Sequence, residues 1–185
     1  MQPATFPAPE HGFLSRVKVR LVTEQDLPAM EWEGEFTHLR RVYQETYERT
    51  VKGLALMWIA DLPEVGILGQ AFIQLICDRP ELANGKDRAY MFSFRVRNQY
   101  RNQGLGSRMI RTFENDLIKR GFRFLTLNVA KENYQAQQLY SKFGYQIVAP
   151  EPGVWSYPDQ NGDWHTVVEP AWRMQKLLIS PQPRL

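Results

Sequence analysis

The sequence predicts a single α/β domain in which helices pack on one mixed β-sheet. A strand pattern, an amphipathic helix pattern and a second strand pattern follow one another between residues 90 and 129, which indicates a right-handed crossover between two parallel strands. Apolar and polar residues alternate over residues 17–21, and a short loop joins two apolar runs, 54–60 and 66–77, as in a hairpin. With 185 residues, 43% of them hydrophobic, the chain is long enough to bury one sizeable core.

The first half of the chain contains clear start and stop signals. Proline is frequent at the beginning, and we expect residues 1–13 to form a flexible arm and residues 14–180 to form the domain. The segment Thr23-Glu-Gln-Asp26 has the capping side chain and early acids of a helix start. Apolar residues spaced by three or four between 36 and 50 predict a longer helix that ends at Gly53. Residues 78–87 are predicted to form a loop.

The second half predicts two more helices and three more strands. Apolar residues at helical spacing run through residues 105–120, and we expect this stripe to be core; it comprises Leu105, Met109, Phe113 and Leu117. Gly121 ends that helix, and residues 122–129 form the next strand. A further helix covers residues 134–143 and stops at Gly144, after which residues 145–178 supply two strands.

Composition excludes several classes of protein. A net charge of +3 and a pI near 9.0 fit either nucleic acid or a ligand with several phosphates, but no continuous basic stripe or nucleic-acid motif is present. The single cysteine, Cys77, excludes internal disulfides, fits a reducing compartment, and lies in an apolar run where a buried, inert thiol is expected. Three scattered histidines and one cysteine predict no zinc site. Without a signal-like or membrane-spanning run, we expect a cytoplasmic protein with no membrane partner.

The hexapeptide Arg101-Asn-Gln-Gly-Leu-Gly106 lies between a predicted strand and a predicted helix. Its two glycines allow a tight turn in which backbone N–H groups point into one concavity, and the helix adds the positive end of its dipole. This pattern indicates a phosphate or pyrophosphate site, although a plain strand-to-helix connection is an equal alternative on the hexapeptide alone. Met109 stands where a dinucleotide-binding motif has its third glycine, and no Gly-Lys-Ser/Thr follows, so dinucleotides and nucleoside triphosphates are disfavoured.

A second motif follows at Asn128-Val-Ala-Lys-Glu-Asn133 and continues through Tyr134-Gln-Ala-Gln-Gln-Leu-Tyr140-Ser-Lys-Phe-Gly-Tyr145. Together with the Arg-x-x-Gly-x-Gly loop upstream, it resembles the GCN5-related N-acetyltransferase (GNAT) family over residues 17–178. The resemblance implies a mixed, mostly antiparallel sheet of about seven strands, with a central parallel pair splayed at the cofactor site and about four helices around it. It also implies acetyl-CoA as co-substrate, no metal, and an amine acceptor that the sequence does not identify.

The resemblance assigns roles to individual positions. It implies that the pyrophosphate of acetyl-CoA is bound by the loop residues Arg101, Asn102, Gln103, Gly104, Leu105, Gly106 and Ser107. It implies that the backbone of Phe94, Arg95 and Val96 binds the pantetheine arm and the thioester. Asn133 would hydrogen-bond the pantetheine. Tyr140 would contact the cofactor and protonate the departing thiolate; its alternative role is that of an aromatic at the edge of the core, on one helical face with Ala136 and Phe143.

Five arginines are predicted to crowd the phosphate loop, and we expect one or two of them to reach a phosphate; they are Arg95, Arg97, Arg101, Arg108 and Arg111. The general base is not identified, because Asn128 stands where some relatives carry a glutamate, and an amide cannot accept an ammonium proton. The candidates are an ordered water and five side chains, Glu33, Glu35, Glu45, His165 and Glu169.

Two segments are candidate walls of the acceptor site. The acids of residues 30–38 would attract a cationic amine, or they mark a solvated helix start. The aromatics Trp155, Tyr157 and Trp164 fall in or next to a predicted loop, 150–163, that would form the opposite wall or a subunit contact in a homodimer. The leading hypothesis is direct acetyl transfer to a primary amine in a ternary complex. The alternatives are a catalytically silent acyl-CoA-binding module and, least favoured, a nucleic-acid-binding domain.

Overall fold

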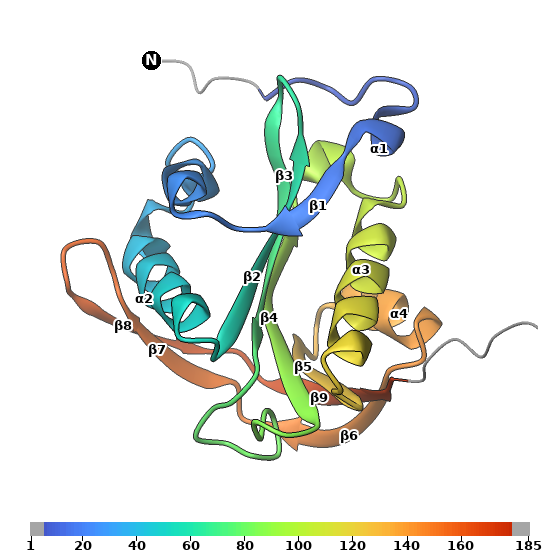
Figure 1. The fold of residues 1–185 in the computed structure, drawn as a ribbon. Helices are drawn as coiled ribbons and strands as arrows, with labels where there is room; N and C mark the ends of the chain where they lie inside the picture. Colours follow the sequence, from blue (N-terminus) through green and yellow to red (C-terminus); the bar gives the residue numbers. More distant parts are fainter. Residues whose placement is uncertain (1–5, 179–185) are drawn as a thin grey trace, which may run out of the picture. The chain divides into compact units, whose positions relative to one another are not determined.

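The computed structural model describes residues 6–178 as a mixed α/β fold built on a seven-stranded sheet (Figure 1). The strands follow one another in space in the order β1-β2-β3-β4-β5-β9-β6, and β7 and β8 form a separate two-stranded sheet. The strands are β1 (Lys18–Leu21), β2 (Ala55–Leu62), β3 (Gly66–Gln74), β4 (Arg88–Val96), β5 (Phe124–Ala130), β6 (Gln146–Glu151), β7 (Val154–Pro158), β8 (Trp164–Val168) and β9 (Ala171–Leu177). The predicted parallel pair is confirmed, because β4 and β5 run parallel.

The four predicted helices are present with two differences, and α1 and η3 were not predicted. The α-helices are α1 (Phe13–Arg16), α2 (Arg40–Val51), α3 (Leu105–Lys119) and α4 (Tyr134–Lys142), with short 3-10 helices η1 (Glu24–Glu31), η2 (Thr37–Leu39) and η3 (Asn98–Tyr100). The start at Thr23 is confirmed, since Thr23 and Asp26 form a capping box, but the helix that follows is 3-10. The predicted helix over residues 36–50 begins as α-helix only at Arg40, because Thr37–Leu39 form the 3-10 helix η2 and Leu39, with φ −99° and ψ 6°, lies outside the α-helical region.

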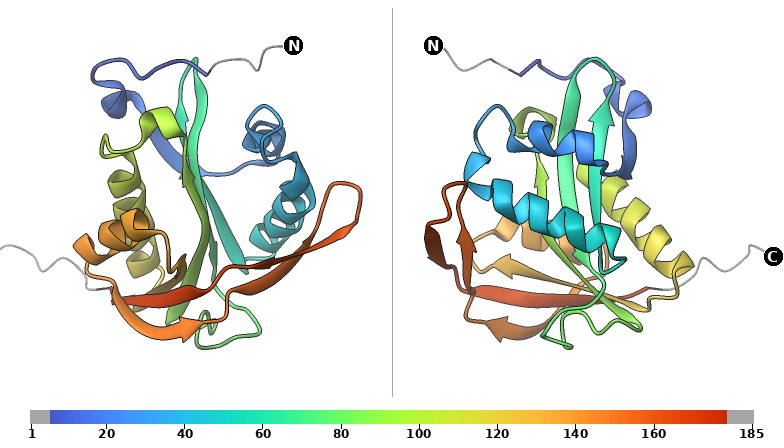
Figure 2. Two further views of the ribbon diagram at one scale, coloured as in Figure 1. Left: turned by 180° about the vertical axis from the view of Figure 1, so that it is seen from behind. Right: turned by 60° about the vertical axis from the view of Figure 1, so that its left-hand side comes forward.

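The tail differs most from the prediction. Four strands were found where two were expected, and the predicted loop over residues 150–163 contains β7. Figure 2 shows β7 and β8 as a hairpin near the orange-red end of the colour bar. Asp159 closes this hairpin, because its Oδ1 accepts hydrogen bonds from the backbone N–H groups of residues 161, 162 and 163 at 2.8–3.0 Å.

The described chain divides into two compact units, each with buried packing of its own. The first unit comprises residues up to Phe72 with Ser93–Met109 and Ser156–Thr166, and the second comprises Ile73–Phe92, Ile110–Trp155 and the chain from Val167 onward. The apolar stripe of α3 is confirmed as core, since none of its four side chains is exposed to solvent. The predicted division into an arm, 1–13, and a domain, 14–180, stays a prediction, and residues 1–5 and 179–180 lie outside the described residues.

The first unit is organised around α2 and the β2–β3 hairpin. The antiparallel register of β1 with β2 pairs Lys18 with Asp61 and Leu21 with Trp58. Tyr43 of α2 is 1% exposed, and its ring packs edge-on against Phe72 of β3 with 5.6 Å between centroids.

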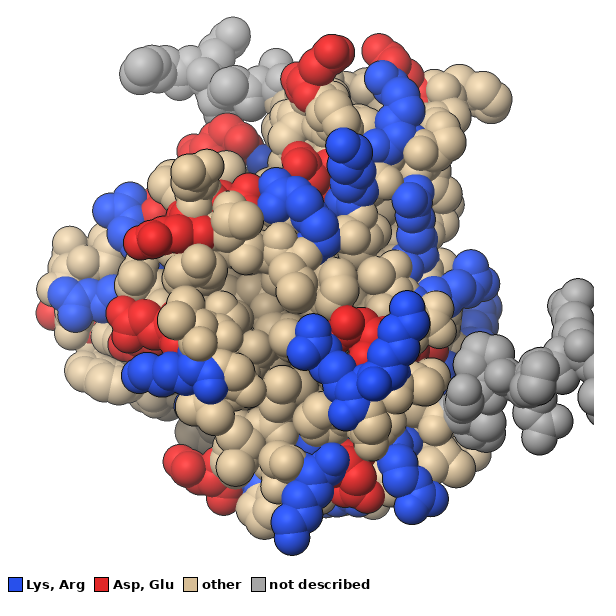
Figure 3. Space-filling model, in the orientation of Figure 1, with Lys and Arg blue, Asp and Glu red and all other residues tan. Residues whose placement is uncertain are grey.

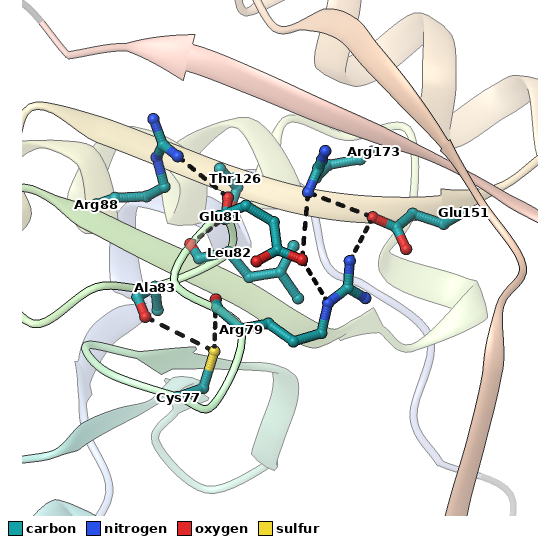
Figure 4. A network of polar contacts seen from close by, with 9 residues as sticks. All are labelled: Cys77, Arg79, Glu81, Leu82, Ala83, Arg88, Thr126, Glu151 and Arg173. Atoms are coloured by element: carbon teal, nitrogen blue, oxygen red, sulfur yellow. Dashed lines mark hydrogen bonds and ion pairs between the residues drawn. The ribbon is translucent and has the colours of Figure 1, made fainter.

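In the second unit β9 lies between β5 and β6 and is antiparallel to both (Figure 2). A network of charged side chains links the loop before β4 to these strands (Figure 4). Arg79 donates to Glu81 at 2.7 Å and to Glu151 at 2.8 Å, and Arg173 lies 3.5 Å from the Glu151 carboxylate. The Cys77 thiol, predicted to be buried, is half-buried and donates to the Arg79 carbonyl at 3.2 Å.

No helix among residues 6–178 has the length and apolar character needed to cross a bilayer. Within the same residues, no group of three or more His, Cys, Asp or Glu side chains is arranged to hold a metal ion. On the face shown in Figure 3, basic and acidic side chains lie next to one another, so the mild positive charge of the chain is not gathered into one continuous patch there.

Candidate active site

The loop predicted to bind a pyrophosphate, residues 101–107, lies at the junction between β4 and α3 and is called the cradle below. After β4, the chain makes one turn of 3-10 helix and then a loop in which Asn102 has φ 58° and Gly104 has φ 89°. A left-handed conformation at two nearly adjacent positions reverses the chain direction just before α3 begins. At Gly104 a Cβ atom would stand 3.4 Å from the Leu14 side chain of α1, an ordinary contact distance, so it is the positive φ that favours glycine here.

The first turn of α3 presents backbone N–H groups without acceptors inside the helix. The earliest helical bond runs from the Arg108 N–H to the Gly104 carbonyl at 3.0 Å. The N–H groups of Leu105, Gly106 and Ser107 therefore precede the helical ladder and have no intrahelical acceptor. Three such donors, together with the positive end of the 15-residue α3, form a site suited to phosphate oxygens.

Arg101 is the arginine best placed to assist these donors. Its Nε donates to the Val96 carbonyl at 2.8 Å, which fixes the base of the guanidinium beside the loop. Its two terminal nitrogens make no hydrogen bond to any residue in the range 6–178. They can therefore donate to a ligand, which agrees with the expectation that one or two arginines reach a phosphate.

The other predicted arginines are held by protein groups. Arg97 is 7% exposed; it donates to the Glu33 carboxylate at 2.7 and 3.0 Å, and to a backbone carbonyl of β3. Arg108 donates to the Leu14 carbonyl of α1. Arg111 lies over the Phe143 ring at 5.5 Å. The basic cluster seen in the sequence is therefore mostly structural, because these side chains point to different partners.

The end of β4 is shaped by close packing and by a local change in the backbone. The paired register between β4 and β5 ends at Met91 and Leu127, although both strands continue, and Ser93 has φ 51°. A Cβ at Gly69 of β3 would approach the Arg95 carbonyl and the Met109 sulfur to 3.0 Å. Glycine at this position lets β3, β4 and α3 pack together, and so fixes the segment Phe94–Val96 to which the thioester was assigned.

The side chain of Arg95 extends into a cluster of aromatic and amide groups. One terminal nitrogen donates to the Tyr43 hydroxyl at 3.2 Å, and the guanidinium lies 4.4 Å from the centre of the Phe36 ring. The Tyr43 hydroxyl also accepts from Gln70 Nε2 at 3.2 Å. Gln70 is fully buried, and its Oε1 has no hydrogen-bond partner in the structure.

The two predicted acceptor walls meet in the first unit. The His38 ring of η2 lies 5.9 Å from the Tyr157 ring of β7, and Tyr157 stacks on His165 of β8 at 5.4 Å between ring centroids. His165 Nε2 is 3.0 Å from Asp159 Oδ2, and this contact lowers the pKa of the Asp159 carboxyl. The segment 30–38 and the tail hairpin thus form one continuous aromatic surface.

The candidate bases differ in their surroundings. Glu33 is bound to Arg97 and His165 is in contact with Asp159, so both are already held by a partner. The remaining three, Glu35, Glu45 and Glu169, are exposed. None of the five is buried.

Asn133 and Tyr140 belong to the second unit, whereas the cradle and the Phe94–Val96 segment belong to the first. Asn133 is the N-cap of α4, and its Oδ1 accepts from the Ala136 N–H at 3.1 Å. Its side-chain oxygen is therefore used within the helix, and the amide nitrogen is left to donate to a ligand.

Tyr140 is 8% exposed and packs edge-on against Tyr145 with 5.8 Å between ring centroids. Burial raises the pKa of Tyr140. Its hydroxyl makes no hydrogen bond to any residue from 6 to 178, which is unusual for a buried tyrosine. The ring is thus at the edge of the core, as in the alternative reading, while the hydroxyl keeps its hydrogen-bonding capacity for a ligand.

The second unit also contains a hydrogen bond, between Tyr90 and Asn128, that the sequence did not predict. Tyr90 of β4 makes a hydrogen bond with the side chain of Asn128 of β5, and burial raises the pKa of Tyr90 to about 12. The Oδ1 of Asn128 is buried and has no partner in the structure. The pairing depends on the parallel β4–β5 register, which places Tyr90 opposite Thr126, and no local sequence signal reports such a register.

Comparison with known proteins agrees with this geometry. Residues 22–145 match the model of the acetyltransferase (GNAT) family. A search of curated protein sequences found no match. Many solved structures match the fold at low sequence identity.

Three of these structures illustrate the likeness. The ribosomal-protein-S18-alanine N-acetyltransferase from Escherichia coli has 20% identity and a TM-score of 0.64, covering 91% of this chain and 98% of that chain. The spermidine/spermine N-acetyltransferase SpeG from Vibrio cholerae has 15% identity and a TM-score of 0.64, covering 90% and 95%. The putative acetyltransferase yncA from Salmonella typhimurium, solved with acetyl-CoA, has 13% identity and a TM-score of 0.65, covering 91% and 97%.

Proposed function

Because the chain belongs to the GNAT family of acetyltransferases, we propose that it transfers the acetyl group of acetyl-CoA directly to a primary amine of a small molecule or peptide in a ternary complex. The observation that carries this proposal is the set of free N–H groups at Leu105, Gly106 and Ser107 beside Arg101. These donors fit a pyrophosphate, which is the most highly charged part of the coenzyme that the family uses. A cytoplasmic location is part of the same proposal.

In this proposal residues 101–107 bind the pyrophosphate, and the Asn133 amide nitrogen and the backbone of Phe94–Val96 orient the pantetheine arm. Acetyl-CoA supplies an acetyl group activated as a thioester. A backbone N–H of Phe94–Val96 donates to the carbonyl oxygen on which negative charge develops. A free alkyl amine has a pKa of about 10, so the acceptor must lose a proton before it attacks the thioester.

Tyr140 is assigned to the leaving thiolate. Its raised pKa keeps the phenol protonated at neutral pH, and its hydroxyl has no protein partner among residues 6–178 that would compete for the proton. An acid held in this way donates to the sulfur as the bond to the acetyl group breaks. The proposal requires the Tyr140 hydroxyl for turnover and does not require it for binding CoA.

The experiment is mass spectrometry of a mixed pool of polyamines, aminoglycosides, amino acids and short peptides after incubation with acetyl-CoA. Wild-type protein is compared with Tyr140→Phe and with Tyr134→Phe, a control on the same helix at a tyrosine that is 70% exposed. We expect a pool member to gain one acetyl group with wild type and Tyr134→Phe, and at least about a hundredfold less product with Tyr140→Phe. Equal turnover by all three proteins would refute the role of Tyr140.

A catalytically silent acyl-CoA-binding module is the second candidate function. Asn128 favours it, because an amide with a buried, unpartnered oxygen stands where some relatives carry a carboxylate. This alternative predicts that CoA binds with ordinary affinity and that no member of any amine pool is acetylated. Calorimetric titration of CoA, run beside the mass spectrometry, separates the two candidates.

A further inference from the structure

Among the described residues, Arg95 lacks an acidic partner, in contrast to four other arginines of the first unit. Arg16, Arg20, Arg40 and Arg97 each form an ion pair with an aspartate or glutamate. Arg95 is half-buried and forms no ion pair within residues 6–178. Half-burial removes part of the water around this guanidinium, so a ligand that supplies a negative charge would bind favourably there.

The Arg95 side chain is nevertheless held in one orientation. Its guanidinium lies 4.4 Å from the centre of the Phe36 ring, and one nitrogen donates to the Tyr43 hydroxyl at 3.2 Å. Gln70 fixes that hydroxyl from the other side, also at 3.2 Å. A guanidinium has five N–H donors, and one nitrogen of Arg95 donates to a group within residues 6–178. The remaining N–H groups, already held in one orientation, can donate in parallel to the two oxygens of a carboxylate.

The neighbouring acids do not make this region attractive to cations. Glu31 accepts from Arg40 at 2.5 Å and from Thr37 at 2.8 Å, and Glu33 is bound to Arg97. Of the three glutamates in residues 30–38, only Glu35 makes no ion pair among the described residues. The uncompensated charge that lies over Phe36 is therefore the positive charge of Arg95.

We propose that the acceptor is an amine that also bears a carboxylate, and that Arg95 is the residue that binds this carboxylate. This inference rests on the proposed acetyl transfer, because it identifies the chemical class of the acceptor. The backbone of Arg95 keeps its assignment to the thioester arm, while its side chain selects the acceptor. The aromatic surface that begins at Phe36 and continues through His38 and Tyr157 packs against the apolar part of the same molecule.

The test measures binding of carboxylates without requiring turnover. The probes are N-acetylglycine, N-acetylleucine and N-acetylphenylalanine, each paired with its primary amide and titrated by calorimetry into protein saturated with CoA. The variants are Arg95→Gln, Arg95→Lys, which keeps the charge but loses the planar fork, and Lys52→Gln, which removes an exposed positive charge at the end of α2. CoA affinity is measured for every variant.

We expect wild type and Lys52→Gln to bind at least one acid about tenfold to a hundredfold more tightly than its amide. Arg95→Gln should bind acid and amide equally, Arg95→Lys should lie between, and CoA affinity should not change. Equal binding of acids and amides by wild type, or a preference for acids that survives in Arg95→Gln, overturns the inference. A loss of CoA affinity in both Arg95 variants also overturns it, because the side chain would then serve the cofactor.

A second measurement separates this inference from the proposed function. Free amino acids and their amides are offered as acceptors with acetyl-CoA, and the acetylated products are quantified. Preference for acids in binding, without any acetylated product, supports the inference about Arg95 and refutes acetyl transfer. Acetylation of amides as fast as acids supports acetyl transfer and overturns the role of Arg95.

Discussion

Tyr140 illustrates how burial alone can prepare a side chain for a chemical task. Burial raises the pKa of its phenol, so the protonated form persists to a higher pH than in a free tyrosine. In bulk water, a phenol with a raised pKa would be a weak acid. In the reaction proposed above, the raised pKa keeps the phenol available as a proton donor over the whole physiological range.

This reasoning predicts the pH dependence of acetyl transfer. A raised pKa means that the acid form is fully present below the ordinary tyrosine value of about 10. We therefore expect kcat/KM to rise with pH as the acceptor amine loses its proton, and to show no fall caused by Tyr140 before about pH 10. The measurement is kcat/KM for the acceptor at saturating acetyl-CoA over that range. A falling limb centred near neutrality that disappears in Tyr140→Phe would contradict the assignment.

Asp26 is a residue whose contribution to stability can be tested directly. Its carboxylate accepts from the Thr23 N–H and from two Arg20 nitrogens, all at 2.8 Å, and these bonds lower its pKa to about 2. A lowered carboxyl pKa adds stability above the unfolded value of about 4, and that stability is lost as the pH falls through about 2.

Asp26→Asn should therefore lower the free energy of unfolding by about 1–2 kcal/mol at neutral pH, and the difference from wild type should shrink toward pH 2. Urea unfolding at several pH values measures this. Glu24→Gln is the control, because it removes an exposed acid from the same helical turn, and it should change stability by less than about 0.5 kcal/mol.

The capping box at Asp26 also shows what kind of residue contact a sequence can predict. The Thr23 and Asp26 signal lies within four adjacent positions, and it was read correctly as a helix start. The contact between Arg20 and Asp61 could not be predicted, since it depends on the antiparallel register of β1 with β2. Arg95 is a similar case, because its partners Tyr43 and Phe36 come from distant parts of the chain.

At the scale of elements, prediction succeeded where stop signals are local. Gly53, Gly121 and Gly144 were each expected to end a helix, and all three follow the observed helices with φ between 70° and 88°. The β7–β8 hairpin was missed because prolines and glycines on both sides of residues 154–158 resemble a loop. Asp159 closes the turn through local hydrogen bonds to the N–H groups of residues 161 and 162, a signal that the loop prediction did not use.

The cradle at the start of α3 leads to an element-scale prediction. Gly104 and Gly121 flank α3, with φ 89° and 87°, so an alanine at either position carries similar backbone strain. Only Gly104→Ala places this strain in the turn that precedes the N–H groups of Leu105, Gly106 and Ser107. We expect Gly104→Ala to weaken CoA binding about tenfold and Gly121→Ala to leave it unchanged, measured by calorimetry. Equal effects would show that helix strain, rather than the cradle, determines affinity.

The charged network of Figure 4 gives a second prediction at this scale. Glu151 is buried and receives Arg79 and Arg173, whereas the Glu81 side chain is 42% exposed. Glu151→Gln should lower the free energy of unfolding by about 2–3 kcal/mol, because two guanidinium groups lose their common counter-ion. Glu81→Gln should cost under about 1 kcal/mol. Denaturant titration compares the free energies of unfolding of the two variants. An equal decrease in both would show that the buried Glu151 contributes no more to stability than the exposed Glu81.

At the scale of the whole molecule, the sequence predicted the fold and the family because two motifs occur in a fixed order and at a fixed separation. The family match over residues 22–145 and the seven-stranded sheet confirm that reading. The acceptor could not be predicted, because the residues around Arg95 are brought together by packing between segments that carry no shared motif. Family membership follows from a local pattern, whereas the choice of substrate depends on tertiary contacts.

The dependence of the whole molecule on its coenzyme gives the final prediction. A ligand that binds only the folded protein stabilises it by RT ln(1 + [L]/Kd), about 2.7 kcal/mol at one hundred times the dissociation constant. If the free N–H groups of α3 and Arg101 bind the pyrophosphate, CoA should raise the unfolding temperature, and the rise should grow with the logarithm of its concentration. Pantetheine, which lacks the pyrophosphate, should give almost no rise at equal concentration. Calorimetric scans with each ligand and with Arg101→Gln test this directly. Equal stabilisation by pantetheine would locate the main binding energy in the arm of the coenzyme and would refute the cradle as its principal anchor.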